Sequence, residues 1–168
     1  MLTQKRLKEV LHYSRATGVF RWRSRAGGPR KWNTRFAGII AGHQRSDGYV
    51  LVCIDYKRYY GHHLAWLYVH GVLLKQLDHC DLDPSNNRIG NLRRATNSQN
   101  MHNSGRHRNN SSGFKGVRWH KRAQKWDARI RIGAGERLHL GLFNTAEAAH
   151  AAYCAAAAKH HGEFSRTV

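Results

Sequence analysis

The sequence has 168 residues, enough for one ordinary domain or for two or three small ones. Lys and Arg number 29 against 10 Asp and Glu, so the formal net charge is +19. A charge of this sign and size indicates a polyanionic partner, with nucleic acid first and an anionic membrane surface second. No apolar run approaches the roughly 20 residues of a membrane span, and no apolar signal core begins the chain, so we expect a cytoplasmic protein outside any membrane.

The first 58 residues contain short elements, most of them predicted strands. Thr3 is a candidate helix N-cap, because Leu7, Val10 and Leu11 follow it at helical spacing. Residues 23–35 are basic and Gly-rich without any apolar period, so we expect a loop whose cations contact phosphates. In chain order, the expected elements are a helix within residues 3–13, strands over 19–22 and 49–55, and turns at 47–48 and 57–58.

A cluster of acids lies in the middle of this basic chain. Of the ten acidic residues, three fall between positions 78 and 83, and His79 lies among them. In so basic a protein, a local acid cluster beside a histidine indicates a cation site. A helix over 62–69, ended by Gly71, is expected before the cluster.

The polar residues around this cluster resemble the HNH nuclease motif, whose site is called ββα-metal. The family's order and spacing are matched by Asp78-His79, Asn91-Leu92-Arg93 and Gln99-Asn100. The flanking residues, from about 60 to 103, also resemble phage HNH endonucleases. The resemblance implies a hairpin that carries Asp-His, a loop that carries the middle Asn, and a helix near 96–103 that returns the last residue to the metal.

The same resemblance assigns roles to four residues. His79 would be the general base that activates water, and Asn91 would orient it and fix its tautomer. Asp78 and Asn100 would bind the metal, and two oxygen ligands leave positions for water and phosphate, which suits Mg²⁺ or another divalent cation such as Mn²⁺. At Cys80-Asp81-Leu82 the family has Ile-Asn-Gly, so the turn of the hairpin must form in another way. Asn86 and Asn87 are assigned to turns, because asparagine tolerates positive φ angles.

Residues 105–112 contain no apolar side chain, so we expect a linker that is not ordered by burial. Its basic residues Arg106 and Arg108 would lie along phosphates. Three alternating strands and one helix are expected after the linker. They are strands over 116–119, 126–132 and 138–143, and a helix between an N-cap at residue 144 or 145 and Gly162.

Residues 113–164 resemble the AP2 DNA-binding domain, in the runs Gly-Val-Arg, Trp-x-Ala-x-Ile, Leu-Gly-x-Phe and Thr-Ala-Glu-Ala-Ala-x-Ala-Ala-Tyr. The resemblance implies a three-stranded antiparallel sheet that packs on one Ala-rich helix and enters the DNA major groove. The residues that would face DNA are Lys115, Arg118, Arg129, Arg131, Arg137 and His139. Plant members have an acid in place of Arg129 and a tryptophan in place of His139, so their base preference does not transfer.

Together these patterns predict a small modular α+β protein. Its segments would be a β-rich, DNA-contacting N-terminal part over 1–58, an HNH core over 59–104, a linker over 105–112 and an AP2-like domain over 113–168. The expected function is a metal-dependent, site-selective DNA endonuclease of the nicking or homing type, acting on double-stranded DNA as a monomer or homodimer, in a bacterial host if it is phage-encoded. Two alternatives stay open: a DNA-binding regulator with a degenerate HNH core, and a nuclease of structured RNA.

Overall fold

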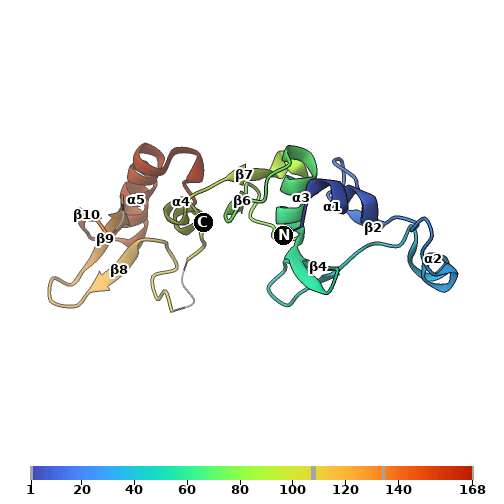
Figure 1. Cartoon of the computed structure of the whole chain (residues 1–168). Coiled ribbons are helices and arrows are strands. Elements are labelled where there is room, and N and C mark those ends of the chain that lie inside the picture. Colours follow the sequence, from blue (N-terminus) through green and yellow to red (C-terminus); the bar gives the residue numbers. More distant parts are fainter. Residues whose placement is uncertain (1, 107–108, 134, 168) are drawn as a thin grey trace. The chain divides into compact units, whose positions relative to one another are not determined.

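The computed structural model describes residues 2–106, 109–133 and 135–167, which form short helices and small antiparallel sheets (Figure 1). This mixture agrees with the predicted α+β class. The chain divides into two compact units, which we call unit 1 (Met1–Arg94) and unit 2 (Ala95–Val168). Within the described ranges, no helix is long and apolar enough to span a membrane.

Unit 1 begins with a helix that is shorter than its apolar spacing predicts. Helix α1 spans Gln4–Val10, and its N-cap is Thr3, as expected. The chain then turns directly into strand β1 (Leu11–Tyr13), which pairs antiparallel with β2 (Phe20–Trp22). The prediction of helix at Leu11 was wrong, because Leu11 is the first residue of β1 and is buried as part of that strand.

A helix also lies where the sequence predicted a loop. Helix α2 spans Arg30–Phe36, and none of its residues is buried. It is held by polar contacts, since the Asn33 side chain bonds both the backbone N–H and the backbone carbonyl of Arg25, at 2.8 and 2.9 Å. The Arg25 guanidinium lies over the Trp32 ring at 3.8 Å from its centroid. Such a helix has no buried stripe, so apolar periodicity could not reveal it.

Three strands follow as an antiparallel sheet in the order β3-β4-β5. They span His43–Gln44, Val50–Ile54 and Lys57–Tyr60. The turn predicted at residues 57–58 was wrong, because Asp55 and Tyr56 make it with φ angles of 48° and 63°. Asp tolerates this left-handed conformation because its short side chain can form local hydrogen bonds. Lys57 and Arg58, which follow the turn, are the first residues of β5.

The last elements of unit 1 are a helix and a hairpin. Helix α3 spans Gly61–His70 and ends at Gly71 with φ 76°, close to the predicted range. Strand β6 (Leu77–His79) pairs antiparallel with β7 (Leu92–Arg94). A 3-10 turn, η1 (Ile89–Asn91), leads directly into β7.

One hydrophobic core joins six elements of unit 1. It takes buried residues from α1, β1, β2, β4, α3 and β7, and also Ala41. They are Leu7, Val10, Leu11, Tyr13, Phe20, Ala41, Val52, Ile54, Leu64, Ala65, Leu67 and Leu92. Residues 1–58 therefore contribute two helices besides their strands, and they share their core with the elements that follow. The border predicted between residues 58 and 59 lies inside this unit.

Unit 2 contains a three-stranded sheet and a long helix. Strands β8 (Val117–His120), β9 (Lys125–Arg131) and β10 (Arg137–Phe143) are antiparallel in the order β10-β9-β8. Helix α5 spans Ala146–His161 from an N-cap at Thr145, and a 3-10 turn, η2 (Gly162–Phe164), follows it. Trp126, Ala128 and Ile130 on β9 pack toward α5, as their alternation predicted.

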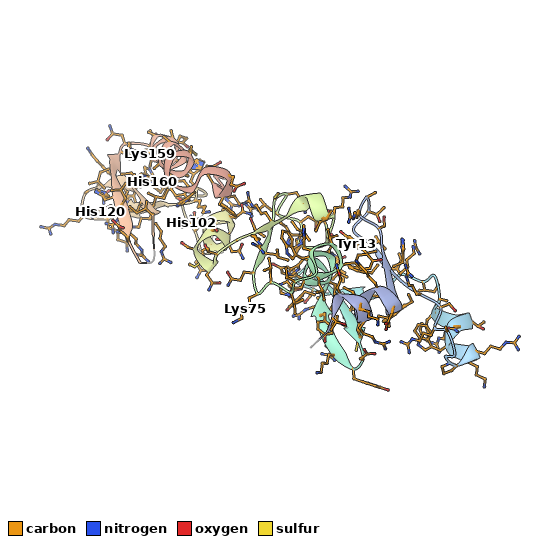
Figure 2. All side chains as sticks on the ribbon, turned by 45° about the horizontal axis from the view of Figure 1, so that its top comes forward. Tyr13, Lys75, His102, His120, Lys159 and His160 are labelled. Carbon is orange, nitrogen blue, oxygen red and sulfur yellow. The ribbon has the colours of Figure 1, made fainter. Side chains whose placement is uncertain are left out.

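Helix α4 (Asn97–Asn103) also belongs to unit 2 and is held there by specific contacts. Its N-terminus has a complete capping box, formed by Thr96 and Gln99. Near its C-terminus, the ring of His102 (labelled in Figure 2) stacks on the His161 ring with centroids 3.7 Å apart. The Lys115 ammonium donates to the carbonyls of His102 and Ser104. The end of α4 is therefore tied both to the chain before β8 and to the end of α5.

Candidate active site

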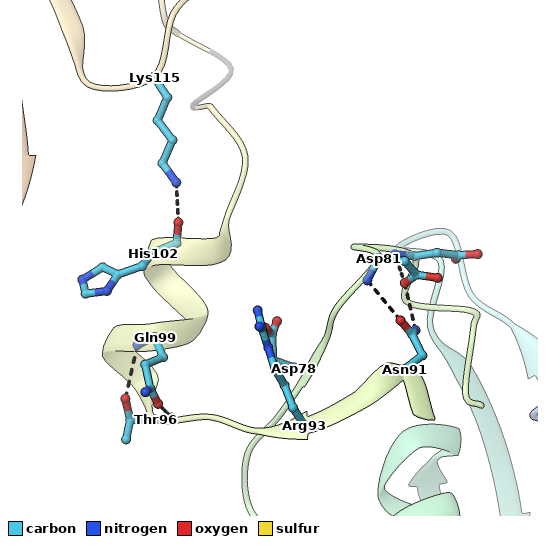
Figure 3. A network of polar contacts seen from close by, with 9 residues as sticks. Asp78, Asp81, Asn91, Arg93, Thr96, Gln99, His102 and Lys115 are labelled. Carbon is cyan, nitrogen blue, oxygen red and sulfur yellow. Dashed lines mark hydrogen bonds and ion pairs between the residues drawn. The ribbon is translucent and has the colours of Figure 1, made fainter. Parts of the chain in front are cut away.

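Strand β6 points Asp78 and His79 to opposite sides of its hairpin. Neighbouring side chains alternate along a strand, and here His79 is only 6% exposed while Asp78 lies opposite Arg93 in the register. Asp78 and Arg93 form an ion pair, with 2.7 Å from Nη2 and 2.9 Å from Nε to the same carboxylate oxygen (Figure 3). The two predicted site residues of β6 therefore have different surroundings.

His79 lies in a cluster of rings that unit 1 brings together from separate elements. The His62 ring, on α3, lies 5.1 Å from the His79 ring, and the Tyr49 ring lies 5.9 Å from it. The His63 ring is 4.2 Å from that of His62, and the Tyr60 ring stacks on His62 at 5.5 Å. We call His62, His63 and His79 the histidine cluster. Sequence reasoning assigned His62 and His63 no firm role, although both stand beside the family-like Leu-Ala-Trp run.

Burial keeps the histidine cluster neutral. It lowers the pKa of His79, while a hydrogen bond with Asn87 and the charge of Asp81 act in the opposite direction. Burial lowers the pKa of His62 to about 3, helped by the charges of His63 and His79. The pKa of His63 is lowered by burial as well. All three imidazoles are therefore uncharged near pH 7, and an uncharged imidazole can accept a proton.

Asn87 is a site residue that sequence reasoning assigned only to a turn. It is 2% exposed, and its backbone carbonyl accepts a hydrogen bond of 2.7 Å from the Tyr13 hydroxyl. Its side chain lies so close to Gly61 that a Cβ there would be 2.8 Å from Nδ2. Gly61 thus lets α3 approach Asn87, whose side chain acts to raise the pKa of His79. The only signal in the sequence is its place four residues before Asn91.

Asn91 binds the loop between β6 and β7. Its Nδ2 donates to Asp81 at 2.8 Å and to the Asn86 carbonyl at 2.9 Å, and its Oδ1 accepts from the Asp81 backbone N–H at 3.0 Å (Figure 3). Asp81 also accepts hydrogen bonds from Asp83 and Asn86. Burial raises the pKa of Asp81, but these hydrogen bonds outweigh it and lower the pKa. Both polar atoms of the Asn91 side chain therefore serve the loop, and no described contact joins them to His79.

The metal ligands predicted from the motif are divided between the two units. Asp78 lies on β6 in unit 1, whereas Asn100 lies on α4 in unit 2, where its backbone N–H bonds the Thr96 carbonyl at 3.0 Å. Unit 1 brings Asp78, His79 and Asn91 onto one hairpin. In residues 2–106, 109–133 and 135–167, no three His, Cys, Asp or Glu residues lie close enough together to hold a metal ion. A carboxylate oxygen and an amide oxygen are nevertheless the donor types that Mg²⁺ takes.

The basic residues predicted to face DNA in unit 2 fall into different environments. Lys115 is bonded to the end of α4, and burial lowers its pKa to about 8. Arg106 donates to the Gly113 carbonyl at 2.9 Å, and Arg108 lies outside the described residues. Lys115 and most of the predicted arginines line one cavity of about 510 Å³. Its lining residues are Lys115, Gly116, Val117, Arg118, Arg129, Ile130, Arg131, Arg137 and Tyr153.

Three of these basic residues meet at one carboxylate. Arg118, Arg129 and His139 all contact Asp127, which is completely buried on β9. Strand register places them on the face of the sheet that points away from α5, together with Arg131 and Arg137. Alternation along β9 places Asp127 on the same face as Arg129 and Arg131, and the carboxylate is buried beneath its partners.

Comparison with known proteins gives one match. A search of curated proteins and a search of solved structures found none. Residues 59–102 match the model of the HNH endonuclease family, and this range contains Asp78, His79, Asn91 and Asn100. The match thus covers α3, the β6–β7 hairpin and most of α4. Residues 59–102 are therefore similar to an HNH endonuclease domain, which indicates a nuclease that acts on DNA.

Proposed function

We propose that this chain is a divalent-metal-dependent, site-selective DNA endonuclease of the nicking or homing type, in which His79 is the general base. The observation that supports the proposal most is the state of His79, an imidazole held neutral by burial inside the segment that matches the HNH family. A histidine that acts as general base must be unprotonated at working pH, and the catalytic effect of such a base is typically about 10²–10⁴-fold. The net charge of +19 suits a DNA substrate.

The residues around His79 would fix its ring for this task. The rings of Tyr49 and His62 would restrict its rotation, because they lie 5.9 and 5.1 Å from the His79 ring. His79 would take the proton of the attacking water and release it after the phosphodiester bond breaks. Asn91 would act through the loop that it holds rather than through direct contact with His79.

Asp78 and Asn100 would hold the divalent cation, Mg²⁺ or Mn²⁺. When bound, such a cation stabilises negative charge on the phosphate and on the leaving oxygen. The Asp78 carboxylate already forms an ion pair with the Arg93 guanidinium, so a cation bound by Asp78 would compete with Arg93 for the carboxylate. One site of this kind cuts one strand, and a double-strand break would need a second protomer or a second event.

The ion pair also supports a second candidate, a DNA-binding regulator without catalysis. A guanidinium that holds the Asp78 carboxylate at 2.7 Å can replace a metal ion as its partner in a degenerate site. The two candidates predict the same DNA affinity but a different outcome for the phosphodiester bond.

A plasmid assay distinguishes them. Supercoiled DNA is incubated with the full chain in Mg²⁺ and in EDTA, and a structured RNA is tested beside it. We expect nicking of DNA in Mg²⁺ only, and a loss of at least about a hundredfold in His79→Ala with DNA affinity retained. The matched control is His12→Ala, because His12 is an exposed histidine on β1. DNA binding without nicking in any divalent cation would establish the regulator, and cleavage of RNA alone would establish the third class.

A further inference from the structure

Asp127 is a fully buried carboxylate on the face of the unit 2 sheet that carries the positive charges. It lies on β9 between Trp126 and Ala128, which pack toward α5, so its own side chain points to the opposite face. Its exposure is 0% because longer side chains lie over it. An ionised group is buried in this way only when it is paired and hydrogen-bonded.

The partners of Asp127 come from all three strands. Arg118 on β8 donates from Nε to Oδ2 at 2.9 Å, and Arg129 on β9 lies with Nε 3.0 Å from Oδ2 and 3.2 Å from Oδ1. His139 on β10 has Nε2 3.1 Å from Oδ1. The three side chains themselves are 60%, 42% and 52% exposed, so each has a contact below and solvent above.

Both arginines are held through Nε, and this determines which of their atoms face outward. Among the described residues, the terminal Nη atoms of Arg118 and Arg129 have no hydrogen-bonding partner. An arginine that is anchored at Nε keeps a rigid edge of two Nη donors, and such an edge can bond O6 and N7 of guanine. A loose arginine would also bind phosphate, but it would lose rotamer entropy when it reads a base.

We propose that Asp127 is a positioning residue that holds Arg118 and Arg129, and with them His139, in the orientation that reads base edges of duplex DNA. Asp127 determines sequence preference without touching the DNA itself. The proposal rests on the site selectivity in the proposed function, and it assigns that selectivity to this sheet and its control to Asp127. Burial raises the pKa of Asp127, but the hydrogen bonds from Arg118 and Arg129 outweigh it and keep the carboxylate ionised.

A positioning role and a merely electrostatic role have opposite consequences for DNA binding. The negative charge of Asp127 repels phosphates, so its removal raises affinity for DNA of any sequence, by about twofold at low salt for one unit charge roughly 8 Å away in water. The loss of oriented arginines lowers preference for the selected sequence over a random one. Each bidentate base contact that loosens costs about 5- to 150-fold in this ratio.

The experiment first selects preferred duplexes from a random library with the full wild-type chain. Affinities for a selected duplex and for a scrambled duplex are then measured for wild type, Asp127→Asn, Arg118→Ala and Arg129→Ala. We expect Asp127→Asn to bind the scrambled duplex at least as well as wild type and to lose at least about fivefold in preference. Once Arg118 and Arg129 are both alanine, adding Asp127→Asn should change preference no further. Glu147→Gln is the control, because it makes the same charge change in the first turn of α5, on the other side of the sheet.

Arg118→Lys covers the case in which the Asp127 variant does not fold. Arg118 is largely exposed, and lysine keeps its charge but lacks the two-donor edge. It should keep affinity for the scrambled duplex and lose preference. Full preference in folded Asp127→Asn or in Arg118→Lys, while Arg118→Ala and Arg129→Ala lose it, would overturn the positioning role. Full preference in all the arginine variants would instead show that the sheet does not read DNA, whereas failure of the nuclease proposal would appear separately, as absence of nicking in the plasmid assay.

Discussion

Arg93 and Asp78 face each other across the β6–β7 hairpin and share an ion pair with side chains only 17% and 11% exposed. A pair so little exposed is hard to break, since the remaining charge then lacks a partner. The carboxylate that the motif assigns to a metal is thus already neutralised by the protein. Two consequences follow, one for stability and one for the response to divalent cations.

Replacing Arg93 by a residue without a guanidinium tests the effect on stability and the effect on cation binding separately. In EDTA, Arg93→Gln should be less stable than wild type by roughly 1–3 kcal/mol, because Asp78 keeps its charge without its strongest partner. Mg²⁺ should then raise the melting temperature of Arg93→Gln more than that of wild type, because the cation no longer competes with an arginine. Thermal melts with and without Mg²⁺ measure both effects, and Arg94→Gln is the control, since Arg94 is exposed. Equal Mg²⁺ shifts in all three proteins would show that Asp78 does not bind the cation.

The pH dependence of cleavage follows from the burial of His79. Its pKa is lowered from the ordinary value of about 6.5, so the neutral base predominates at every pH above 6.5. The nicking rate should be nearly flat from there toward pH 8 and fall only below pH 6.5. Single-turnover rates across a pH series test this. A rise that continues through pH 7 would mean that His79 is protonated in the working enzyme, contrary to its surroundings in the fold.

His62 should make unit 1 sensitive to acid. Its pKa of about 3 lies below the value near 6.5 in an unfolded chain, so the folded state binds the proton less well. The stability that this provides is complete above pH 6.5 and is lost as pH falls toward 3. Between pH 7 and pH 4.5 the loss from this group is about 3 kcal/mol.

Chemical denaturation at these two pH values checks the effect. His62→Asn should lose about 3 kcal/mol less on acidification than wild type, while His12→Asn, at an exposed position, should behave as wild type. An identical loss in His62→Asn and wild type would show that other groups control the acid transition.

Asn91 and Asp81 should behave as one unit. Two hydrogen bonds join Asn91 and Asp81. Asn91→Ala and Asp81→Ala should therefore each lower the free energy of unfolding by about 1–3 kcal/mol, and the double variant should lower it by little more than either. A double-mutant cycle by urea denaturation measures this coupling. Additive losses, together with a shifted pH profile in Asn91→Ala alone, would instead favour the family role in which Asn91 orients His79 directly.

Deletion of residues 113–168 tests the attachment of α4. Seven residues are too few for a stable isolated helix, and the described contacts at the end of α4 include Lys115 and His161. A nuclease core that ends at residue 104, as the segment ranges predicted, would stay intact after this deletion, but we expect α4 to melt and Asn100 to lose its fixed position. Hydrogen exchange of residues 97–103 and plasmid nicking report the two effects. Protected α4 amides in the truncated chain would restore the simpler modular view.

The sequence predicted those elements that are determined by patterns among neighbouring residues. The alternation of Trp126, Ala128 and Ile130 located β9, and the cap at Thr145 located the start of α5. Capping and alternation are properties of neighbouring residues, so one sequence suffices for them. The missed helix α2 is the opposite case, because Asn33 and Trp32 hold it through contacts with Arg25 instead of an apolar stripe.

The candidate site was predicted as a list of residues but not as an arrangement. The motif located His79, yet its neighbours Tyr49 and His62 come from elements that only the folded core brings together. Asn87 was assigned to a turn because asparagine is common there, and its burial depends on Gly61 and on the distant Tyr13. Contacts between residues so far apart leave no periodic trace in the sequence.

The hydrogen bond from Tyr13 to the Asn87 carbonyl joins residues 74 positions apart, and it bears on how the chain matures. Gly18, in the same hairpin, lies so near the backbone of Asn87 and Arg88 that a Cβ there would be only 2.5–2.6 Å away. Contacts of such sequence separation form late in folding, because a long loop must close first. On the ribosome the β1–β2 hairpin emerges long before its partner loop. The surroundings of His79 are therefore completed only when nearly all of unit 1 has been synthesised, so a nascent or prematurely terminated chain carries the basic residues that attract DNA without the finished pocket around its histidine.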